Sequence, residues 1–226
     1  MNNNLIFDLG FLDGTDSKNY LDKGYKVIAV EANPDLVISV QKKHTDFYSN
    51  PDFGIYNKVI SDKSKEIVPF YVNEKRPEVS SLEKWIATQN YTQEVITENV
   101  ESMTLHDLIF TFGVPYYIKV DVEGVDKIVA KQIYELEEKP RFVSFELNKD
   151  DFIDIFYYMK KSGYTKYKLV NQLNNPKNSS GDFGKYLENW LDYNTAFSNY
   201  CKYRELKIID NVNLGIGWID LHCGIE

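Results

Sequence analysis

Apolar residues follow the chain in two alternating patterns, short continuous runs that are typical of buried strands and stretches with helical spacing. Residues 5–9 and 26–30 form the first two apolar runs. Between them lies a helical stretch, residues 17–23, with Asp16 as its expected N-cap. The pattern therefore predicts a strand–helix–strand unit at the start of the chain.

The same alternation continues along most of the sequence. A helix is predicted to begin at Asn33-Pro34, where a capping side chain precedes a proline, and another follows the Thr-x-x-Asp capping box at Thr104. Spacing assigns the other elements: strands at 55–60, 67–72, 116–122, 142–147, 164–170 and 217–223, and helices after Gly124 and at 151–162. Such alternation predicts an α/β fold with a mostly parallel, doubly wound sheet, whose last strand lies at or near an edge.

Size and charge narrow the classes of protein to consider. A chain of 226 residues with 43% hydrophobic content can bury one substantial core, so a single domain over residues 1–226 is expected. The net charge of −8 argues against binding to nucleic acid, which requires clustered Lys and Arg. No run approaches the roughly 18 apolar residues of a membrane span, the first residues do not resemble a secretory leader, and Cys201 and Cys223 are too few for a disulfide framework. We therefore expect a soluble, cytoplasmic protein.

The segment from Asp8 to Gly14 has the context of a cofactor-binding turn, because it follows a predicted strand and precedes a predicted helix. Gly10 lets the chain reverse, and Gly14 lets it approach a ligand closely. Glu31 ends the next strand about 20 residues later, where a carboxylate can accept both ribose hydroxyl protons. Loop and carboxylate predict an adenosine-containing ligand, although two glycines also occur simply to make such a turn. Leu12 replaces the second glycine of the dinucleotide fingerprint, so NAD is disfavoured.

Further short motifs extend through nearly the whole chain. In order they are Asp8-Leu9-Gly10 with Gly14 and Asp16-Ser17, Tyr20-Leu21, Val27 to Glu31 with Asn33-Pro34, Ser61-Asp62, Thr104 to Leu108, Ile118 to Gly124, Phe145-Glu146-Leu147, Gly181 to Gly184, and Trp218 to His222. In this combination and order the chain resembles the FkbM family of methyltransferases. Two positions depart from the family pattern: Leu12 stands where Asn or His is common, and His106 replaces an acidic residue.

The resemblance implies a Rossmann-like class I methyltransferase fold with an antiparallel strand at the C-terminal end, and S-adenosylmethionine as the methyl donor. By position, Gly10 and Gly14 would line the methionine part, Glu31 the ribose, and Asp62 the adenine amino group. The full set of expected donor-binding residues is Asp8, Gly10, Phe11, Gly14, Asp16, Glu31, Ala32, Asn33, Ser61, Asp62 and Asp121.

The family also implies the acceptor class, a hydroxyl oxygen that often belongs to a sugar or a secondary metabolite. We therefore expect O-methylation of a sugar, a glycan or a related small molecule. The alternatives are a lipid, polyketide or peptide acceptor, and a binding module that keeps the fold and the donor but has lost turnover.

Methyl transfer to a hydroxyl requires alignment of the acceptor oxygen and a group that takes its proton. The strand-end acids Asp121, Glu123 and Glu146 are the natural candidates for this base, and His222 is another. Asp121 or Glu123 is preferred because the two adjoin at one strand end; the alternative is that they only cap the following helix. His222 can equally be a hydrogen-bonded structural residue.

The same residues Asp121, Glu123, Glu146 and His222 can also be interpreted as ligands of a divalent metal, because hard cations take carboxylate oxygens. This interpretation is not favoured, since the sequence spacing fixes no coordination geometry.

Residues 171–203 interrupt the alternation and are expected to form an insertion over the strand ends. Aromatic residues recur there every three or four positions, which predicts an amphipathic helix packed on the body: Phe183, Tyr186, Trp190, Tyr193, Phe197 and Tyr200. Alternatively, one or two of them form a lid with Asn174 or Asp182 that stacks on a sugar ring. Residues 73–99, which include Ser80-Ser81, are expected to be irregular, either as an acceptor-side loop or as a plain connection.

Overall fold

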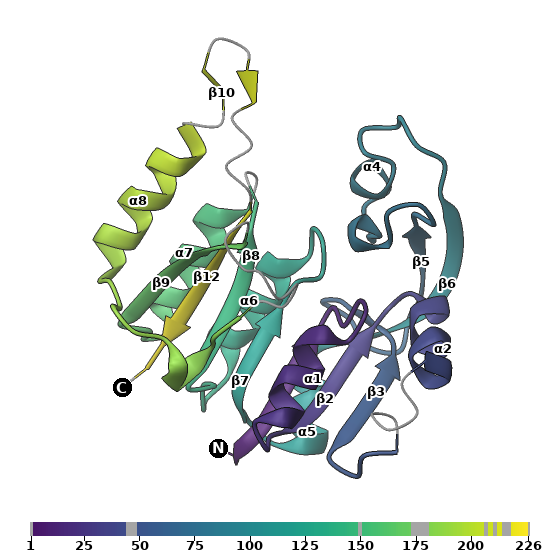
Figure 1. The fold of residues 1–226 in the computed structure, drawn as a ribbon, viewed down its shortest axis with the longest axis horizontal. Helices are drawn as coiled ribbons and strands as arrows, with labels where there is room; N and C mark the ends of the chain where they lie inside the picture. Colours follow the sequence, from purple (N-terminus) through teal and green to yellow (C-terminus); the bar gives the residue numbers. More distant parts are fainter. Residues whose placement is uncertain are drawn as a thin grey trace.

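The computed structural model describes residues 2–43, 49–148, 151–172, 181–205, 208–209, 212–213 and 218–225. Its centre is a seven-stranded sheet in the order β3-β2-β1-β7-β8-β12-β9 (Figure 1). The strands are β1 (Asn2–Leu9), β2 (Lys26–Glu31), β3 (Phe53–Asn57), β7 (Pro115–Val120), β8 (Phe142–Leu147), β9 (Lys166–Asn171) and β12 (Ile219–Gly224).

The sheet is parallel except at its C-terminal strand. The pairs β2–β3, β1–β2, β1–β7 and β7–β8 are parallel, whereas β12 runs antiparallel to both of its neighbours, β8 and β9. The predicted mostly parallel sheet with an antiparallel C-terminal strand is confirmed. β12 lies one place in from the edge, which β9 occupies.

Helices cover both faces of this sheet, as expected for a doubly wound fold. One face carries α1 (Thr15–Asp22) and α2 (Pro34–Lys43), and its core includes Tyr20, Tyr117 and Phe183. The other face carries α5 (Leu105–Phe112), α6 (Asp126–Glu135) and α7 (Phe152–Lys161), which pack on the larger core cluster. The capping box predicted at Thr104 is present, because Thr104 and Asp107 exchange hydrogen bonds with each other's main-chain amides.

The N-terminus of α1 differs from the prediction. The helix begins at Thr15 rather than at residue 17, and its N-cap is Gly14, which has a left-handed φ of 81°. Asp16 therefore lies inside the first turn of the helix. There its carboxylate interacts favourably with the positive end of the helix dipole.

A smaller sheet stands beyond the ends of β2 and β3 (Figure 1). It consists of β4 (Val59–Ile60), β6 (Ile96–Met103) and β5 (Ile67–Val72), in that order. The single strand predicted at 55–60 is thus divided into β3 and β4. The prediction that residues 73–99 are irregular is wrong at its end, where β6 begins. β6 carries mostly polar residues, and only Val100 and Ser102 are buried, so the sequence shows no clear strand pattern there.

Two short helices, η1 (Pro77–Val79) and α4 (Lys84–Ala87), lie between β5 and β6. They belong to the same part of the molecule as the small sheet, since Ser81 forms a bridge to Tyr71 of β5. The connection is therefore a folded segment that is attached to a sheet.

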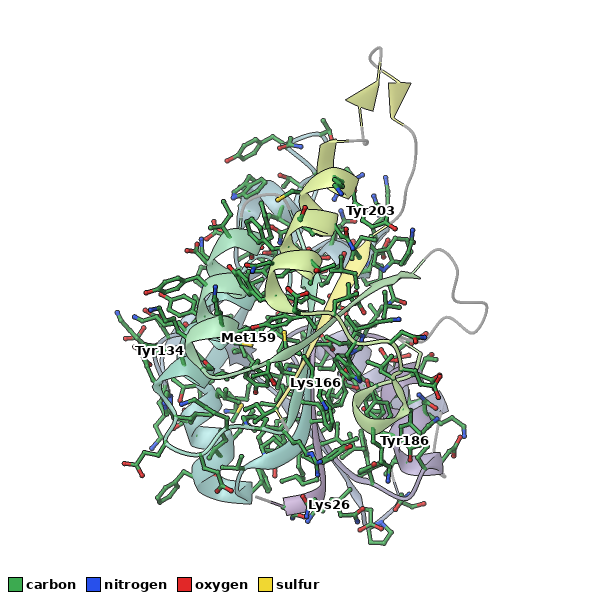
Figure 2. The ribbon with its side chains drawn as sticks, turned by 90° about the vertical axis from the view of Figure 1, so that its left-hand side faces the viewer. Lys26, Tyr134, Met159, Lys166, Tyr186 and Tyr203 are labelled. Atoms are coloured by element: carbon green, nitrogen blue, oxygen red, sulfur yellow. The ribbon has the colours of Figure 1, made fainter. Side chains whose placement is uncertain are left out.

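The aromatic residues of the expected insertion pack on the body of the protein. Phe183 is 1% exposed and stacks on Tyr117. The predicted helix over all six aromatics is too long, because α8 begins only at Tyr193 and ends at Glu205. Its residues Phe197 and Tyr200 pack against Phe152 of α7. Figure 2 views the side of the molecule on which α8 lies, with Tyr203 of this helix labelled.

The preceding residues of this segment include η3 (Gly184–Tyr186), and a hairpin of β10 (Ile208–Ile209) and β11 (Val212–Asn213) follows α8. The predicted lid residue Asn174 and the first residue of the strand predicted at 217–223 lie outside the described residues. Across the described part of the chain, no helix combines the length and the apolar character that a membrane crossing requires.

Candidate functional site

The loop that follows β1 is shaped by its contact with β7. Gly10 has a φ of 88°, and a Cβ atom there would lie 1.8 Å from the main-chain oxygen of Asp121. The amides of Gly10 and Phe11 both donate to the carbonyl oxygen of Val30, at 3.0 and 3.3 Å. Only glycine fits at this position, so the sequence forces the loop to turn tightly over the ends of β1, β2 and β7.

Glu31 closes the loop from the end of β2. Its Oε2 accepts a hydrogen bond of 2.9 Å from the amide of Leu12, and its Oε1 accepts one of 2.8 Å from the amide of Asn33. Burial raises the pKa of this carboxyl, while the two main-chain donors oppose that shift. Each carboxylate oxygen has a second lone pair, so Glu31 can still accept hydrogen bonds from two hydroxyl groups of a ligand.

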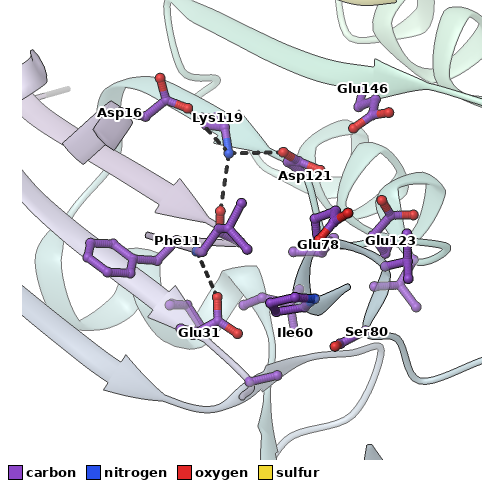
Figure 3. A pocket seen from close by; sticks show the side chains of 18 of the residues that line it. Phe11, Asp16, Glu31, Ile60, Glu78, Ser80, Lys119, Asp121, Glu123 and Glu146 are labelled. Atoms are coloured by element: carbon purple, nitrogen blue, oxygen red, sulfur yellow. Dashed lines mark hydrogen bonds and ion pairs between the residues drawn. The ribbon is translucent and has the colours of Figure 1, made fainter. Parts of the chain in front are cut away.

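Lys119 connects the loop to the carboxylates around it. Its Nζ donates to the Gly10 carbonyl oxygen and to Asp121 Oδ2, both at 3.1 Å (Figure 3). It also lies 3.6 Å from Asp16 and 3.8 Å from Asp8. Burial alone would lower the pKa of Lys119, but these carboxylates outweigh it and raise the pKa well above its usual value. Lys119 is therefore a fixed cation among three acids.

A further group of carboxylates, whose charges are balanced by fewer ion pairs, lies beside Lys119. Oxygens of Asp121, Glu123 and Glu146 come within 4.8 Å of one another, and Asp220 of β12 is paired in register with Glu146. Burial, followed by the charge of Asp121, raises the pKa of Glu123 to about 8. The same two causes raise the pKa of Glu146 well above its usual value. Glu123 therefore holds a proton in the neutral pH range.

Glu31, Lys119 and the carboxylates of Asp121, Glu123, Glu146 and Asp220 border one cavity of about 900 Å³ at the carboxyl ends of the parallel strands. The strand ends provide its charged side, which Figure 3 shows from close by. The small sheet and the following segment provide the opposite side, with Ile60, Phe70, Val79 and Leu82 among its apolar residues. The cavity thus has an apolar wall that faces fixed charges, as ligand pockets commonly do.

A family comparison identifies the type of protein that carries this cavity. The model of the methyltransferase FkbM domain matches residues 10–166, which is more than half of the chain. The chain belongs to the FkbM methyltransferase family. The resemblance noted from its motifs is thereby confirmed.

Solved structures and curated proteins show much weaker similarity to this chain. The chain is 7% identical to the precorrin-6y C5,15-methyltransferase of Geobacter metallireducens GS-15, with a TM-score of 0.47 over 99% of this chain and 80% of that chain. It is 8% identical to a SAM-dependent methyltransferase of Archaeoglobus fulgidus, with a TM-score of 0.43 over 99% and 87% of the two chains. No curated protein matches significantly. The family assignment depends on the domain match.

Most of the site residues expected in this FkbM methyltransferase border the cavity. These are Gly10, Phe11, Asp16, Glu31, Ala32, Asp121, Glu123 and Glu146. Three others lie behind the lining and support it: Asp8 accepts a 2.5 Å hydrogen bond from Ser17, Gly14 packs on the Phe11 ring, and Asn33 donates to Glu31.

Three expected site residues are placed elsewhere. Among the described residues, Ser61 and Asp62 are not part of the cavity lining, because β4 ends before them and the chain turns away to a hydrogen bond with Met103. His222 is 1% exposed, stacks on Tyr117 and is likewise outside the lining. Burial, followed by the charge of Lys168, lowers the pKa of His222 to about 3, so its imidazole is a very weak base.

The structure also adds residues that sequence analysis did not select. In the sequence, Lys119 stood out only as part of the Ile118 to Gly124 motif. A lysine inside a buried, apolar strand is unusual and could have marked it as a site residue. Arg76, Glu78 and Gln172 line the cavity from segments without a recognisable pattern. Asp220 is 7% exposed and accepts a hydrogen bond from Gln172. The antiparallel pairing of β12 brings it beside Glu146, and sequence spacing gives no such register.

Proposed function

We propose that this FkbM methyltransferase transfers a methyl group from S-adenosylmethionine to a hydroxyl oxygen of a sugar, a glycan or a related small molecule. One observation carries the donor assignment. Glu31 is a buried carboxylate that two main-chain amides hold at the rim of the cavity, at the end of the second parallel strand. A carboxylate in this position suits two neighbouring ribose hydroxyl groups, and the absence of a phosphate-binding glycine at Leu12 suits a nucleoside without phosphates.

The other residues of the loop fit the remaining part of such a donor. Asp16 and Asp121 offer carboxylates to an ammonium group, and Lys119 offers its ammonium to a carboxylate. The apolar wall formed by Ile60, Phe70 and the residues after them offers a surface for a flat base. The donor would supply an electrophilic methyl group on a sulfonium, so the protein needs to align the acceptor and to take its proton.

Glu123 is the best candidate for the proton acceptor. Asp121 is held by Lys119 at 3.1 Å, so its carboxylate is already engaged in an ion pair. Glu123 has a pKa raised to about 8, which lies near the working pH that favours a general base. We therefore assign proton removal to Glu123 and positioning of the acceptor to Asp121 and Glu146, with His222 outside the reaction.

A labelled-methyl transfer assay over a panel of sugars, glycosides, lipids and peptides tests the proposal. Glu123→Gln is expected to lose about 100-fold in turnover while it still binds the donor, since a positioned base contributes 10²–10⁴. Glu137→Gln changes an exposed glutamate outside the cavity lining and serves as the matched control. Full turnover in both Glu123→Gln and Asp121→Asn would show that neither carboxylate is the base.

A divalent metal is the alternative use of the carboxylate group. Asp121, Glu123 and Glu146 have the spacing for three ligand atoms. We propose that protons, and not a metal, compensate these charges. Exhaustive chelation should then leave methyl transfer unchanged. A loss of transfer that added magnesium reverses would assign the group to a cation.

One observation favours a binding module without turnover. Leu12 places an apolar side chain, 36% exposed, in the cavity lining where the family commonly has a polar residue. Binding of S-adenosylhomocysteine without any labelled product across the panel would support this second candidate function.

A further inference from the structure

A second cavity of about 450 Å³ adjoins the first one. Glu123 lines both cavities, and the second continues past Gly124 toward α4. Its other walls come from Trp85, Gln89 and Asn90 on one side and from Lys127 and Asn148 on the other. The two cavities therefore meet at Glu123.

The wall that carries Trp85 is fixed to the strand end. Ser81 Oγ donates a hydrogen bond of 2.6 Å to the carbonyl oxygen of Glu123 and accepts one of 2.9 Å from the amide of Glu83. A Cβ atom on Gly124 would lie 2.5 Å from Ile86 Cδ1, so the two segments are in close contact. The second cavity is thus held by the same corner of the chain that presents Glu123.

The side chains of this cavity suit a ring that carries several hydroxyl groups. Trp85 is 41% exposed and offers an aromatic surface with an N–H donor at its edge. Gln89, Asn90 and Asn148 bring amide groups, which both donate and accept hydrogen bonds. A phosphate would meet the carboxylates of Glu83 and Asp151, which a neutral hydroxylated ring would not be repelled by.

Unusual backbone angles occur at the same place. Gln89, Asn90 and Tyr91 have φ values of 49°, 61° and 66°, and Glu123 has a φ of 37°. Left-handed angles at residues other than glycine cost conformational energy and are concentrated at binding sites. The strained angles at Gln89, Asn90 and Glu123 therefore lie in the lining of the second cavity.

We propose that the second cavity binds a second sugar ring of the acceptor, next to the ring that is methylated in the first cavity. This inference depends on the proposed function for its first cavity. It adds a requirement on the length of the acceptor: two linked rings bind more tightly than either ring alone. The contact with Trp85 accounts for this difference in affinity.

The test uses ¹⁵N-labelled protein saturated with S-adenosylhomocysteine. The probes are matched pairs of methyl glycosides and disaccharides built from glucose, galactose, mannose and rhamnose, at millimolar concentrations. The indole signal of Trp85 is assigned by its loss in Trp85→Phe. We expect at least one disaccharide to shift this signal and to bind about tenfold more tightly than its single-ring partner, the size of one good aromatic contact.

Variants separate the role of Trp85 from general effects. Trp85→Ala should bring disaccharide binding down to that of the single ring, and Trp85→Phe should retain part of the difference. Phe110→Ala changes a side chain that is 94% exposed on α5, and it should leave binding unchanged. A Trp85 signal that no saccharide shifts, or equal disaccharide binding by Trp85→Ala and the unmodified protein, would overturn the inference.

Failure of the two proposals can be told apart. If S-adenosylhomocysteine does not bind, the proposed function itself fails. If it binds and a labelled acceptor is found while Trp85 makes no contribution, only the second sugar site is wrong.

Discussion

The carboxylates around the cavity differ in how their charge is compensated. Asp121 forms an ion pair with Lys119, whereas no Lys or Arg in the described part of the chain forms one with Glu123 or Glu146. Burial and mutual repulsion raise the pKa of both glutamates. The Glu123 pKa of about 8 makes the site sensitive to pH near neutrality.

The pH dependence of methyl transfer follows from this protonation. Below its pKa of about 8, Glu123 carries a proton and cannot accept one from the acceptor hydroxyl; above that pKa it can. We expect kcat/KM to rise with pH up to about 8 in the unmodified protein, and the small residual rate of Glu123→Gln to lack this rise. An identical rising limb in the variant would assign the titration to another group.

Glu146 should make the protein less stable at alkaline pH. Because its pKa is higher in the folded chain than in the unfolded one, the folded state binds the extra proton, and the free energy of unfolding falls as the pH rises above the usual pKa of a glutamate. Glu146→Gln should weaken this fall and stabilise the protein at pH 8 by on the order of 1 kcal/mol, at the expense of activity. Chemical denaturation at several pH values measures both effects.

The exposed Glu137→Gln variant is the control for this change and should behave like the unmodified protein. Lower stability of Glu146→Gln at pH 8 would mean that the carboxylate of Glu146 is compensated in a way that the pKa argument omits.

At the scale of elements, the loop after β1 is determined by one close backbone contact. Gly10→Ala would place a methyl group 1.8 Å from the Asp121 carbonyl oxygen. The main chain at residue 10 and at Asp121 cannot move apart without distorting the strand ends. We therefore expect a loss of donor binding and a destabilisation of about 1–3 kcal/mol beyond the cost of the left-handed angle. Calorimetry and thermal unfolding measure the two effects.

Gly163→Ala is the matched control for this loop. Gly163 has the same φ of 88°, and its added Cβ would meet no atom within 4 Å. This variant should lose only about 1–2 kcal/mol of stability, from the strain of the left-handed angle, and keep full donor binding. Equal effects of the two substitutions would show that the contact with Asp121 is unimportant.

Elements with strong local signals were predictable from the sequence. β1, β2, β7 and β8 each contain a short apolar run, and the capping box at Thr104 marks the start of α5. β6 was missed because only one of its faces is partly buried, and polar residues fill most of its positions. The helix over the aromatic residues was extended too far because Phe183 is buried by tertiary contacts with Tyr20 and Tyr117 and not by helical spacing.

At the scale of the whole molecule, the half of the site that follows the parallel strands was predictable, because their carboxyl ends meet at one edge. Gly10, Glu31, Asp121 and Glu146 were found in this way. The opposite wall was not predictable. Residues 76–82 are positioned by the small sheet and Asp220 by the antiparallel strand β12, and the registers of both depend on tertiary contacts. Asp62 and His222 have suitable chemistry, but their side chains lie outside the cavity lining.

The central claim is that the cavity holds an adenosyl sulfonium donor through the turn at Gly10 and the carboxylate of Glu31. Calorimetric titration with S-adenosylhomocysteine, NAD and NADP tests it most directly, with Glu31→Gln beside Glu137→Gln. The account predicts saturable binding of S-adenosylhomocysteine alone, weakened about tenfold or more by Glu31→Gln, because a buried acceptor of hydrogen bonds is lost. Binding of a dinucleotide in its place, or an affinity for S-adenosylhomocysteine that Glu31→Gln leaves unchanged, would contradict it.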